Sequence, residues 1–168
     1  MAFNRILIAN RGEIAIRLAR AIADCEATSV AVYAEDDAQS LHVRSADQAI
    51  ALQGQGVAAY LDAAQLIRIA KEQNCDAIHP GYGFLSENAD FARACEQAGI
   101  TFIGPAPEVL DTFGDKASAR RLALQQGVPL TQGTNEPTTL EQARDFMQSL
   151  GDGAAVMLKA LAGGGGLG

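Results

Sequence analysis

A lysine followed by a run of glycines is the pattern in this sequence with the clearest chemical meaning. Lys159 ends an apolar stretch, and Gly163 to Gly166 come soon after it. Consecutive glycines leave backbone N–H groups free to wrap a phosphate chain, and a lysine adds compact positive charge for the same oxygens. This is not a P-loop, in which the lysine follows the glycines. A flexible linker is the alternative, and the preceding stretch with its lysine favours a phosphate-binding loop.

A second lysine lies in the sequence Gly114-Asp115-Lys116. Asp115 is a good N-cap for a following helix, because its carboxylate accepts hydrogen bonds from the first free N–H groups. Lys116 then belongs to the first turn, as an exposed residue. Taken alone, this spacing favours the start of a helix over a binding site.

The segment from His79 to Asn88 follows a buried strand, at the end where open α/β sheets place their functional loops. Gly81 and Gly83 permit a tight backbone path, and Ser86 is a candidate N-cap for the next helix. The segment contains no paired nucleophile and base. From spacing alone we expect it to shape a turn, with His79 as a hydrogen-bonded structural residue.

The first strand-to-helix turn, Asn10 to Glu13, lies where a dinucleotide-binding protein carries GxGxxG. It contains a single glycine, and Arg11 and Glu13 would obstruct a pyrophosphate. The acidic pair Glu35-Asp36 ends the second strand, as a ribose-binding acid does, but without the glycines it indicates a solvated strand end. The sequence therefore disfavours an NAD-binding oxidoreductase.

Composition narrows the class of protein. The 168 residues have a net charge of −7, with 48% hydrophobic and 20% charged residues, as in a globular protein with a core. An acidic chain repels phosphate backbones, so we expect no nucleic-acid binding. The apolar run Ile6 to Ala9 is too short for a signal peptide or a membrane span, which predicts a cytoplasmic protein without membrane contact. Cys25, Cys75 and Cys95 indicate reduced thiols, and no metal-ligand pattern is present.

Short apolar runs alternate with helical periodicity as far as Ile103. This alternation predicts an α/β fold, a parallel sheet with helices on both faces. The predicted strands are Arg5–Asn10, Ser29–Ala34, Ala46–Leu52, Cys75–His79 and Ile100–Ile103. The predicted helices are Glu13–Ala23, one from the N-cap Asp62 through Ile69, and one from the N-cap Ser86 to Ala98.

The remaining residues have a different rhythm. They predict helices over Glu108–Phe113 and Lys116–Gln126, a helix to Leu150 that a capping box in Thr138-Thr139-Leu140-Glu141 opens, and a strand over Ala154–Ala160. We place the domain boundary between Gly104 and Asp111, which assigns residues 1–110 and 111–168 to two domains. The second has too few elements to close a core by itself, so we expect a truncated domain.

Four stretches, in this order, resemble the biotin carboxylase family. They are Ile8 to Ala15, His79 to Asn88, Phe102 to Pro105, and Gly114-Asp115-Lys116 with the later Lys159-Ala160 and its glycine loop. Together they span nearly the whole chain, and the first two are long and specific. Acetyl-CoA, propionyl-CoA, pyruvate and urea carboxylases share this region, in which a Rossmann-like domain precedes an ATP-grasp fold.

The resemblance implies an ATP-dependent ligase. In the family, ATP activates bicarbonate as carboxyphosphate, biotin on a carrier is then carboxylated, and Mg²⁺ neutralises the phosphates. The resemblance implies that Lys116 and Lys159 contact ATP and that Gly165 and Gly166 close over its phosphates. It also implies a biotin carboxyl carrier domain and a carboxyltransferase as partners. The family's residues for Mg²⁺, bicarbonate and biotin lie further along its chain, so we expect this piece alone to show no turnover.

Two details bear on this interpretation. The family usually has arginine where this chain has Leu167, and losing a guanidinium weakens phosphate contacts. Arg17 and Arg20 match positions associated with a homodimer contact, with an ordinary solvated helix face as the alternative. A non-catalytic dimerisation or scaffold module of the same fold is therefore the alternative function.

Overall fold

The computed structural model describes residues 3–134 and 136–158. The chain divides into two compact units, Met1–Leu110 and Asp111–Gly168, and each is described by itself. Within the described ranges, no helix combines the length and the apolar character needed to cross a membrane.

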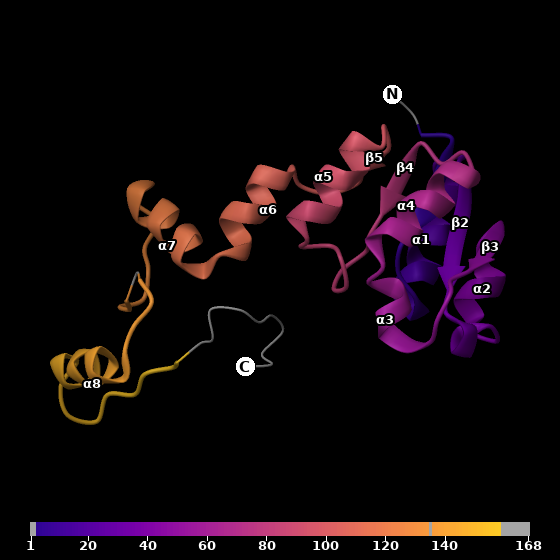
Figure 1. The fold of residues 1–168 in the computed structure, drawn as a ribbon. Helices are drawn as coiled ribbons and strands as arrows, with labels where there is room; N and C mark the ends of the chain where they lie inside the picture. The colour runs from indigo at the N-terminus through magenta and orange to yellow at the C-terminus, as the bar shows by residue number, and fades with distance from the viewer. Residues whose placement is uncertain (1–2, 135, 159–168) are drawn as a thin grey trace. The chain divides into compact units, whose positions relative to one another are not determined.

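The first unit is built on a five-stranded sheet in which each neighbouring pair is parallel (Figure 1). The strand order is β3-β2-β1-β4-β5, which places β1 at the centre. The strands are β1 (Arg5–Ile8), β2 (Thr28–Tyr33), β3 (Gln48–Ala51), β4 (Ala77–His79) and β5 (Thr101–Phe102). Each overlaps a predicted segment, and the predicted α/β fold with a parallel sheet is confirmed.

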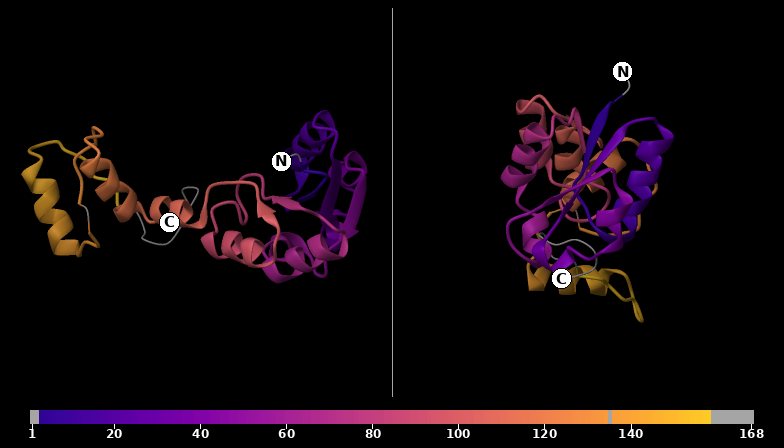
Figure 2. Two further views of the ribbon diagram at one scale, coloured as in Figure 1. Left: turned by 90° about the horizontal axis from the view of Figure 1, so that it is seen from above. Right: turned by 90° about the vertical axis from the view of Figure 1, so that its right-hand side faces the viewer.

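The strands of the first unit are connected through helices. These are α1 (Gly12–Asp24), the short 3₁₀ helix η1 (Glu35–Asp37), α2 (Leu41–Ser45), α3 (Gly56–Tyr60), α4 (Ala63–Glu72) and α5 (Ala89–Gln97), and α6 (Pro107–Gly114) follows β5. The right-hand view of Figure 2 shows helices on both sides of the sheet.

The sheet is buried on both faces because side chains alternate along each strand. In β1, Leu7 belongs to one core cluster, while Ile6 and Ile8 belong to the other. The Leu7 cluster includes side chains from α3, α4 and α5, and the second cluster is formed with α1. The apolar run of β1 is thus explained by burial on both sides.

Of the two helix caps predicted in the first unit, one is confirmed and one is wrong. The Asp62 carboxylate caps α4 by accepting from the Gln65 N–H at 2.9 Å, as predicted. The predicted cap Ser86 is wrong, because Asn88 caps α5 by accepting from the Phe91 N–H at 2.8 Å. Ser86 lies too early in the chain, because α5 begins at Ala89 and the Ser86 N–H still bonds within the preceding turn, to the Gly83 carbonyl.

The described part of the second unit contains the end of α6, α7 (Lys116–Gln125) and α8 (Leu140–Ser149). Asp115 caps α7 as predicted, accepting from the N–H groups of Ala117 at 2.7 Å and Ser118 at 3.1 Å. The capping box of α8 lies one residue later than predicted, with Thr139 as the cap and Gln142 as its partner.

The predicted strand Ala154–Ala160 is wrong over residues 154–158, which form neither helix nor strand. A strand needs a neighbour for its N–H and C=O groups, and the only sheet among the described residues belongs to the first unit. The rest of that prediction lies outside the described residues. No side chain in residues 111–134 or 136–158 is buried, so this part of the chain has no core of its own.

His42 in α2 links the stability of the first unit to pH. The residue is 1% exposed, its Nε2 lies 3.2 Å from the Val32 carbonyl oxygen, and its Nδ1 has no hydrogen-bond partner within the described residues. Because a carbonyl only accepts, Nε2 carries the proton. Burial lowers the pKa of His42, so the folded state holds the ring neutral.

We expect the free energy of unfolding to fall as the pH drops below the unfolded pKa of histidine, about 6.5. A histidine whose folded pKa is lowered binds its proton preferentially in the unfolded chain, so stability is complete above that pH and lost below it. His42→Asn offers an amide donor to Val32 but does not titrate. Urea unfolding between pH 7.5 and 5.5 should show a loss about 1 kcal/mol smaller for His42→Asn than for the parent chain. His79 titrates in both chains, and equal losses would contradict the assignment.

Candidate functional site

Asn10 closes the edge of the sheet at the point where the strand order reverses. The order changes direction between β1 and β4, and open α/β sheets bind ligands at such a point. Asn10 follows β1 and is 3% exposed. Its amide nitrogen donates to the carbonyls of Pro80 at 2.7 Å and Tyr82 at 2.9 Å, and its amide oxygen accepts from the Arg11 N–H at 2.8 Å. The amide therefore ties the end of β1 to the loop after β4.

This arrangement argues against a dinucleotide site. In such sites the crevice between the two strand ends stays open for a pyrophosphate, which binds at the N-terminus of the first helix. Here the Asn10 amide bridges the two strand ends, and Arg11 stands at the N-cap position of α1. The geometry agrees with the missing glycine fingerprint.

The loop after β4 follows a constrained backbone path. Gly81 and Gly83 both have φ of 67°, and Phe84 has φ of 45°. A Cβ on Gly81 would lie 2.8 Å from the Asn10 amide nitrogen, so both conformation and space require glycine there. His79 Nδ1 accepts from the Gly81 N–H at 3.0 Å, and burial lowers the His79 pKa. His79 is thus a neutral structural residue, as the sequence predicts.

Tyr82 is the exposed aromatic side chain of this loop. It is 62% exposed, and its hydroxyl donates to a carboxylate oxygen of Glu13 in the first turn of α1. The hydrogen bond to Glu13 raises the pKa of Tyr82. The hydroxyl therefore stays protonated at neutral pH, with its hydrogen directed at an acid.

A polar network holds the loops after β1 and β2. Asp37 accepts hydrogen bonds from the Tyr60 hydroxyl at 2.7 Å, the Arg11 guanidinium at 3.0 Å and the Ser40 hydroxyl at 3.0 Å. The Tyr60 hydroxyl also accepts from the Ala34 N–H at 3.1 Å. Burial raises the pKa of Asp37, but the three hydrogen bonds outweigh it and hold the pKa below its ordinary value. Asp37 is therefore an anion at neutral pH.

Two ring contacts extend the network to the loop after β4. The Tyr60 ring stacks on Phe84 with centroids 5.4 Å apart and planes 13° apart. The Arg11 guanidinium carbon lies 5.7 Å from the Tyr60 ring centroid. Tyr60 is fully buried. The loops after β1, β2 and β4 thus meet around one tyrosine.

Sequence reasoning missed Asp37 and Tyr60. Glu35 and Asp36 are exposed, as predicted for a solvated strand end, but the next acid turns inward. Its partner Tyr60 is 23 residues further along the chain, and no local spacing connects the two. The feature of the sequence that could have indicated Tyr60 is that it is the one aromatic residue in a helix of otherwise small or aliphatic residues.

The contacts at this edge of the sheet orient the loops that meet there. None of the contacts around Asn10, Asp37 and Tyr60 pairs a nucleophile with a base. Within residues 3–134 and 136–158, no group of three or more His, Cys, Asp or Glu side chains could hold a metal ion. The edge therefore positions a loop and its exposed tyrosine.

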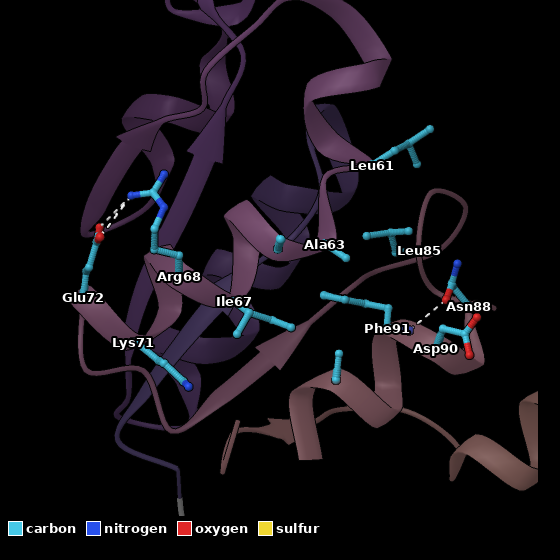
Figure 3. Close-up of a pocket in the computed structure, with 12 residues that line it drawn as sticks. Leu61, Ala63, Ile67, Arg68, Lys71, Glu72, Leu85, Asn88, Asp90 and Phe91 are labelled. Atoms are coloured by element: carbon cyan, nitrogen blue, oxygen red, sulfur yellow. Dashed lines mark hydrogen bonds and ion pairs between the residues drawn. The ribbon is translucent and has the colours of Figure 1, made fainter. Parts of the chain in front are cut away.

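A wide hollow of about 750 Å³ lies elsewhere in the first unit, along α4 and α5 (Figure 3). Ile67, Leu85 and Phe91 give it an apolar lining, and Arg68 and Glu72 form an ion pair at 3.0 Å on α4. That pair is about half exposed and belongs to a single helix. Its other polar lining residues are Lys71, Asn88 and Asp90, and Asn88 is already used in capping α5. The carboxyl edge of the sheet, with its switch in strand order, remains the candidate site.

Arg17 and Arg20 are exposed on α1. They share an open depression with two acids, Glu13 and Asp24, and with two apolar residues, Ile16 and Ala21. This face carries both charge signs, and it is the part of the first unit to which the predicted homodimer contact maps.

The residues predicted to contact ATP are only partly within the described ranges. Lys116 is exposed and begins α7 directly after Asp115. Lys159, Gly165, Gly166 and the departure Leu167 lie outside the described residues. The structure therefore describes one of the four residues predicted to contact ATP.

Replacing Asn10 by aspartate should destabilise the first unit. Aspartate has no N–H donor, so the carbonyls of Pro80 and Tyr82 would lose their partner and face a carboxylate instead. We expect the free energy of unfolding to drop by about 3 kcal/mol. Asn88→Asp is the matched control, since aspartate also caps a helix, and it should change stability by less than about 0.5 kcal/mol. Equal urea midpoints for the two variants would overturn the role given to Asn10.

Comparison with known proteins matches this architecture to one family. The family model for the biotin carboxylase N-terminal domain matches residues 2–110. Pyruvate carboxylase 1 of Caenorhabditis elegans is 52% identical over 170 residues, which cover 99% of this chain and 14% of that protein. The biotin carboxylase of Halalkalibacterium halodurans is 48% identical over 172 residues, covering 99% of this chain and 37% of that protein.

Solved structures give the same answer. The biotin carboxylase domain of a single-chain bacterial carboxylase has a TM-score of 0.88 and 61% identity, over 95% of this chain and 37% of that one. A biotin carboxylase domain dimer of the Hydrogenobacter thermophilus 2-oxoglutarate carboxylase, in complex with MgADP, ADP and bicarbonate, has a TM-score of 0.93 and 42% identity, over 99% of this chain and 36% of that one. The chain thus spans between 14% and 37% of these relatives. It belongs to the biotin carboxylase family and covers the N-terminal part of the carboxylases in that family.

Proposed function

We propose that this chain is the N-terminal part of an ATP-dependent ligase that uses bicarbonate to carboxylate biotin on a carrier protein. The match of 99% of the chain to a biotin carboxylase at 48% identity is the observation that carries the proposal. The complex of the Hydrogenobacter domain with MgADP and bicarbonate supports the same substrates here. We assign turnover to the full-length carboxylase and expect none from the 168 residues alone.

We also propose that the chain contains two domains. Residues 1–110 form the Rossmann-like N-terminal domain, and residues 111–168 begin the ATP-grasp domain. The family match and the first compact unit both end at residue 110, which supports this boundary. The absence of buried side chains in the described residues beyond 110 supports a domain whose core needs further chain.

ATP is assigned to Lys116, Lys159, Gly165 and Gly166. Lys116 fits a phosphate contact because it is exposed at the N-terminus of α7, where the helix dipole is positive. The Asp115 carboxylate already occupies the N–H groups of Ala117 and Ser118, so the Lys116 ammonium rather than the backbone would meet the phosphates. Mg²⁺ would supply neutralisation of phosphate charge when bound, and it is not assigned to a described residue.

The proposed partners are a biotin carboxyl carrier domain and a carboxyltransferase. Relatives of this chain include a complete multifunctional pyruvate carboxylase from Rhizobium etli and a single-chain, multi-domain long-chain acyl-CoA carboxylase. For compartment we propose the cytoplasm, where thiols stay reduced. The free thiols Cys75 and Cys95 are buried, and burial raises the pKa of Cys75 to about 11 and of Cys95 to about 12, so both are unreactive.

A homodimer through α1 is part of the proposal. The face of Arg17 and Arg20 also carries Glu13 and Asp24, so it has both charge signs. A two-fold axis across such a face sets the arginines of one copy against acids of the other. The Hydrogenobacter relative, a biotin carboxylase domain dimer, supports this.

Neutralising the two lysines should weaken nucleotide binding. In the full-length carboxylase we expect Lys116→Gln and Lys159→Ala each to raise the KM for MgATP about tenfold, because each removes a compact positive charge from the phosphates. Lys71→Gln, at an exposed lysine of α4, is the control and should leave that KM within twofold. An unchanged KM in both test variants would contradict the ATP assignment.

Reversing charge on α1 should weaken self-association. We expect Arg17→Glu combined with Arg20→Glu to shift the full-length carboxylase toward monomer in sedimentation velocity at about micromolar concentration, since like charges would then meet across the two-fold axis. Arg44→Glu, at an exposed arginine of α2, should leave the sedimentation coefficient unchanged. If the double variant sediments with the parent, α1 is a solvated face.

A further inference from the structure

We propose that Tyr60 is a positioning residue, whose ring fixes the left-handed turn at Phe84 and thereby sets where Tyr82 stands at the carboxyl edge of the sheet. The role in the reaction rests on the proposed function, since it concerns a substrate of the full-length carboxylase. Tyr60 would touch no substrate itself and would act through the loop after β4.

The turn at Phe84 needs an external support. A left-handed conformation costs a residue with a side chain roughly 1–2 kcal/mol. Phe84 adopts this conformation, with φ of 45°, directly after Gly83, whose φ is 67°. Such conformations persist where the surroundings over-determine them, commonly at functional sites. We therefore expect a contact of the Phe84 ring that offsets the cost of its left-handed conformation.

The Tyr60 ring supplies that contact. The two rings are nearly parallel, at 13°, with centroids 5.4 Å apart. Tyr60 is fully buried while Phe84 is partly buried, so the tyrosine is the fixed member of the pair. The stack sets the direction of the Phe84 side chain and, through it, the backbone that leads back to Tyr82.

Tyr60 is itself held on three sides. Its hydroxyl accepts from the Ala34 N–H at 3.1 Å and donates to Asp37 at 2.7 Å. Arg11 binds the same carboxylate oxygen at 3.0 Å and lies 5.7 Å from the ring centroid. These contacts and the burial of the ring restrict its position, which is the property that a positioning residue needs.

The charge of the loop indicates which substrate it meets. Residues 80–88 contain no Lys or Arg, and Glu87 is their only charged residue. The exposed Tyr82 donates its hydroxyl hydrogen to another acid, Glu13. Arg17 of α1 also acts electrostatically on the Tyr82 hydroxyl, so the loop and its surroundings carry two acids and one cation and offer no net positive charge to a phosphate or bicarbonate. A neutral flat ring such as that of biotin does not need such a charge. Disturbing Tyr60 should therefore affect the biotin substrate and spare the nucleotide.

The kinetic test uses the full-length carboxylase and free biotin as acceptor. Tyr60→Leu removes the stack and the hydroxyl, and we expect the KM for biotin to rise about tenfold while the KM for MgATP stays within twofold. Tyr60→Phe keeps the ring, and we expect it to restore the KM for biotin to within threefold of the parent. Val30→Ala, in the buried part of β2, is the control for lost core packing and should change neither KM.

Three results would overturn the proposal. They are a Tyr60→Leu enzyme with the kinetics of Val30→Ala, an equal rise in both KM values, and a Tyr60→Phe enzyme as impaired as Tyr60→Leu. If the parent enzyme shows no biotin-dependent ATP cleavage, it is the proposed function that fails.

A spectroscopic test then decides the positioning role independently of activity. The chain contains no tryptophan, so Tyr82→Trp gives a single reporter in the loop. In the 168-residue chain, adding Tyr60→Leu should lower the fluorescence anisotropy of that tryptophan, because the loop loses its support. Adding Val30→Ala should not. Unchanged anisotropy with Tyr60→Leu would refute the role.

Discussion

The first unit depends on one side-chain amide, that of Asn10. A loop that leaves a buried strand carries backbone carbonyls that the sheet no longer pairs, and each buried one left without a donor costs about 1–3 kcal/mol. Pro80 and Tyr82 have such carbonyls just beyond the end of β4, and the two N–H bonds of one amide satisfy both. Because Asn10 lies just beyond the end of the neighbouring β1, with only Ala9 between them, the same bonds fix how the two strand ends meet. The glycine at 81 follows from this contact, since no Cβ fits against the amide.

The second constraint is the anion at Asp37. Withdrawing a carboxylate from water is unfavourable unless donors replace the lost solvent, and Asp37 has three. One of these donors, Tyr60, also stacks its ring on Phe84, so it connects the polar network to an apolar contact in the loop after β4. The segments after β1, β2 and β4 are thereby determined together, although the only regular structures that carry these contacting side chains after β2 are the three-residue 3₁₀ helix η1 and the short helix α3. Because these segments share the contacts of Asp37 and Tyr60, their positions at the edge of the sheet are well defined although the edge contains no nucleophile.

The elements that sequence reasoning predicted well are those whose cause is local. Strands such as β1 are buried on both faces, and a run of Ile and Leu indicates this without reference to the rest of the chain. Asp62 and Asp115 cap helices through N–H groups two or three residues away, and both were predictable. Ser86 was mistaken for a cap because the choice between it and Asn88 depends on the turn through Gly83 and Phe84, which distant residues hold.

The parts of the site that were not predicted depend on contacts between residues that are far apart in the sequence. Asn10 reaches residues 70 and 72 positions away, and Tyr60 reaches Asp37 across 23. A local pattern cannot report such pairs, and the polar partners look like ordinary surface residues until the sheet brings them together. For Lys116, the proposed ATP contact depends on the family resemblance, because by spacing alone this residue is only the first of a capped helix. Geometry and resemblance thus inform different halves of the chain, because the first unit encloses its own core whereas the described residues beyond 110 bury no side chain.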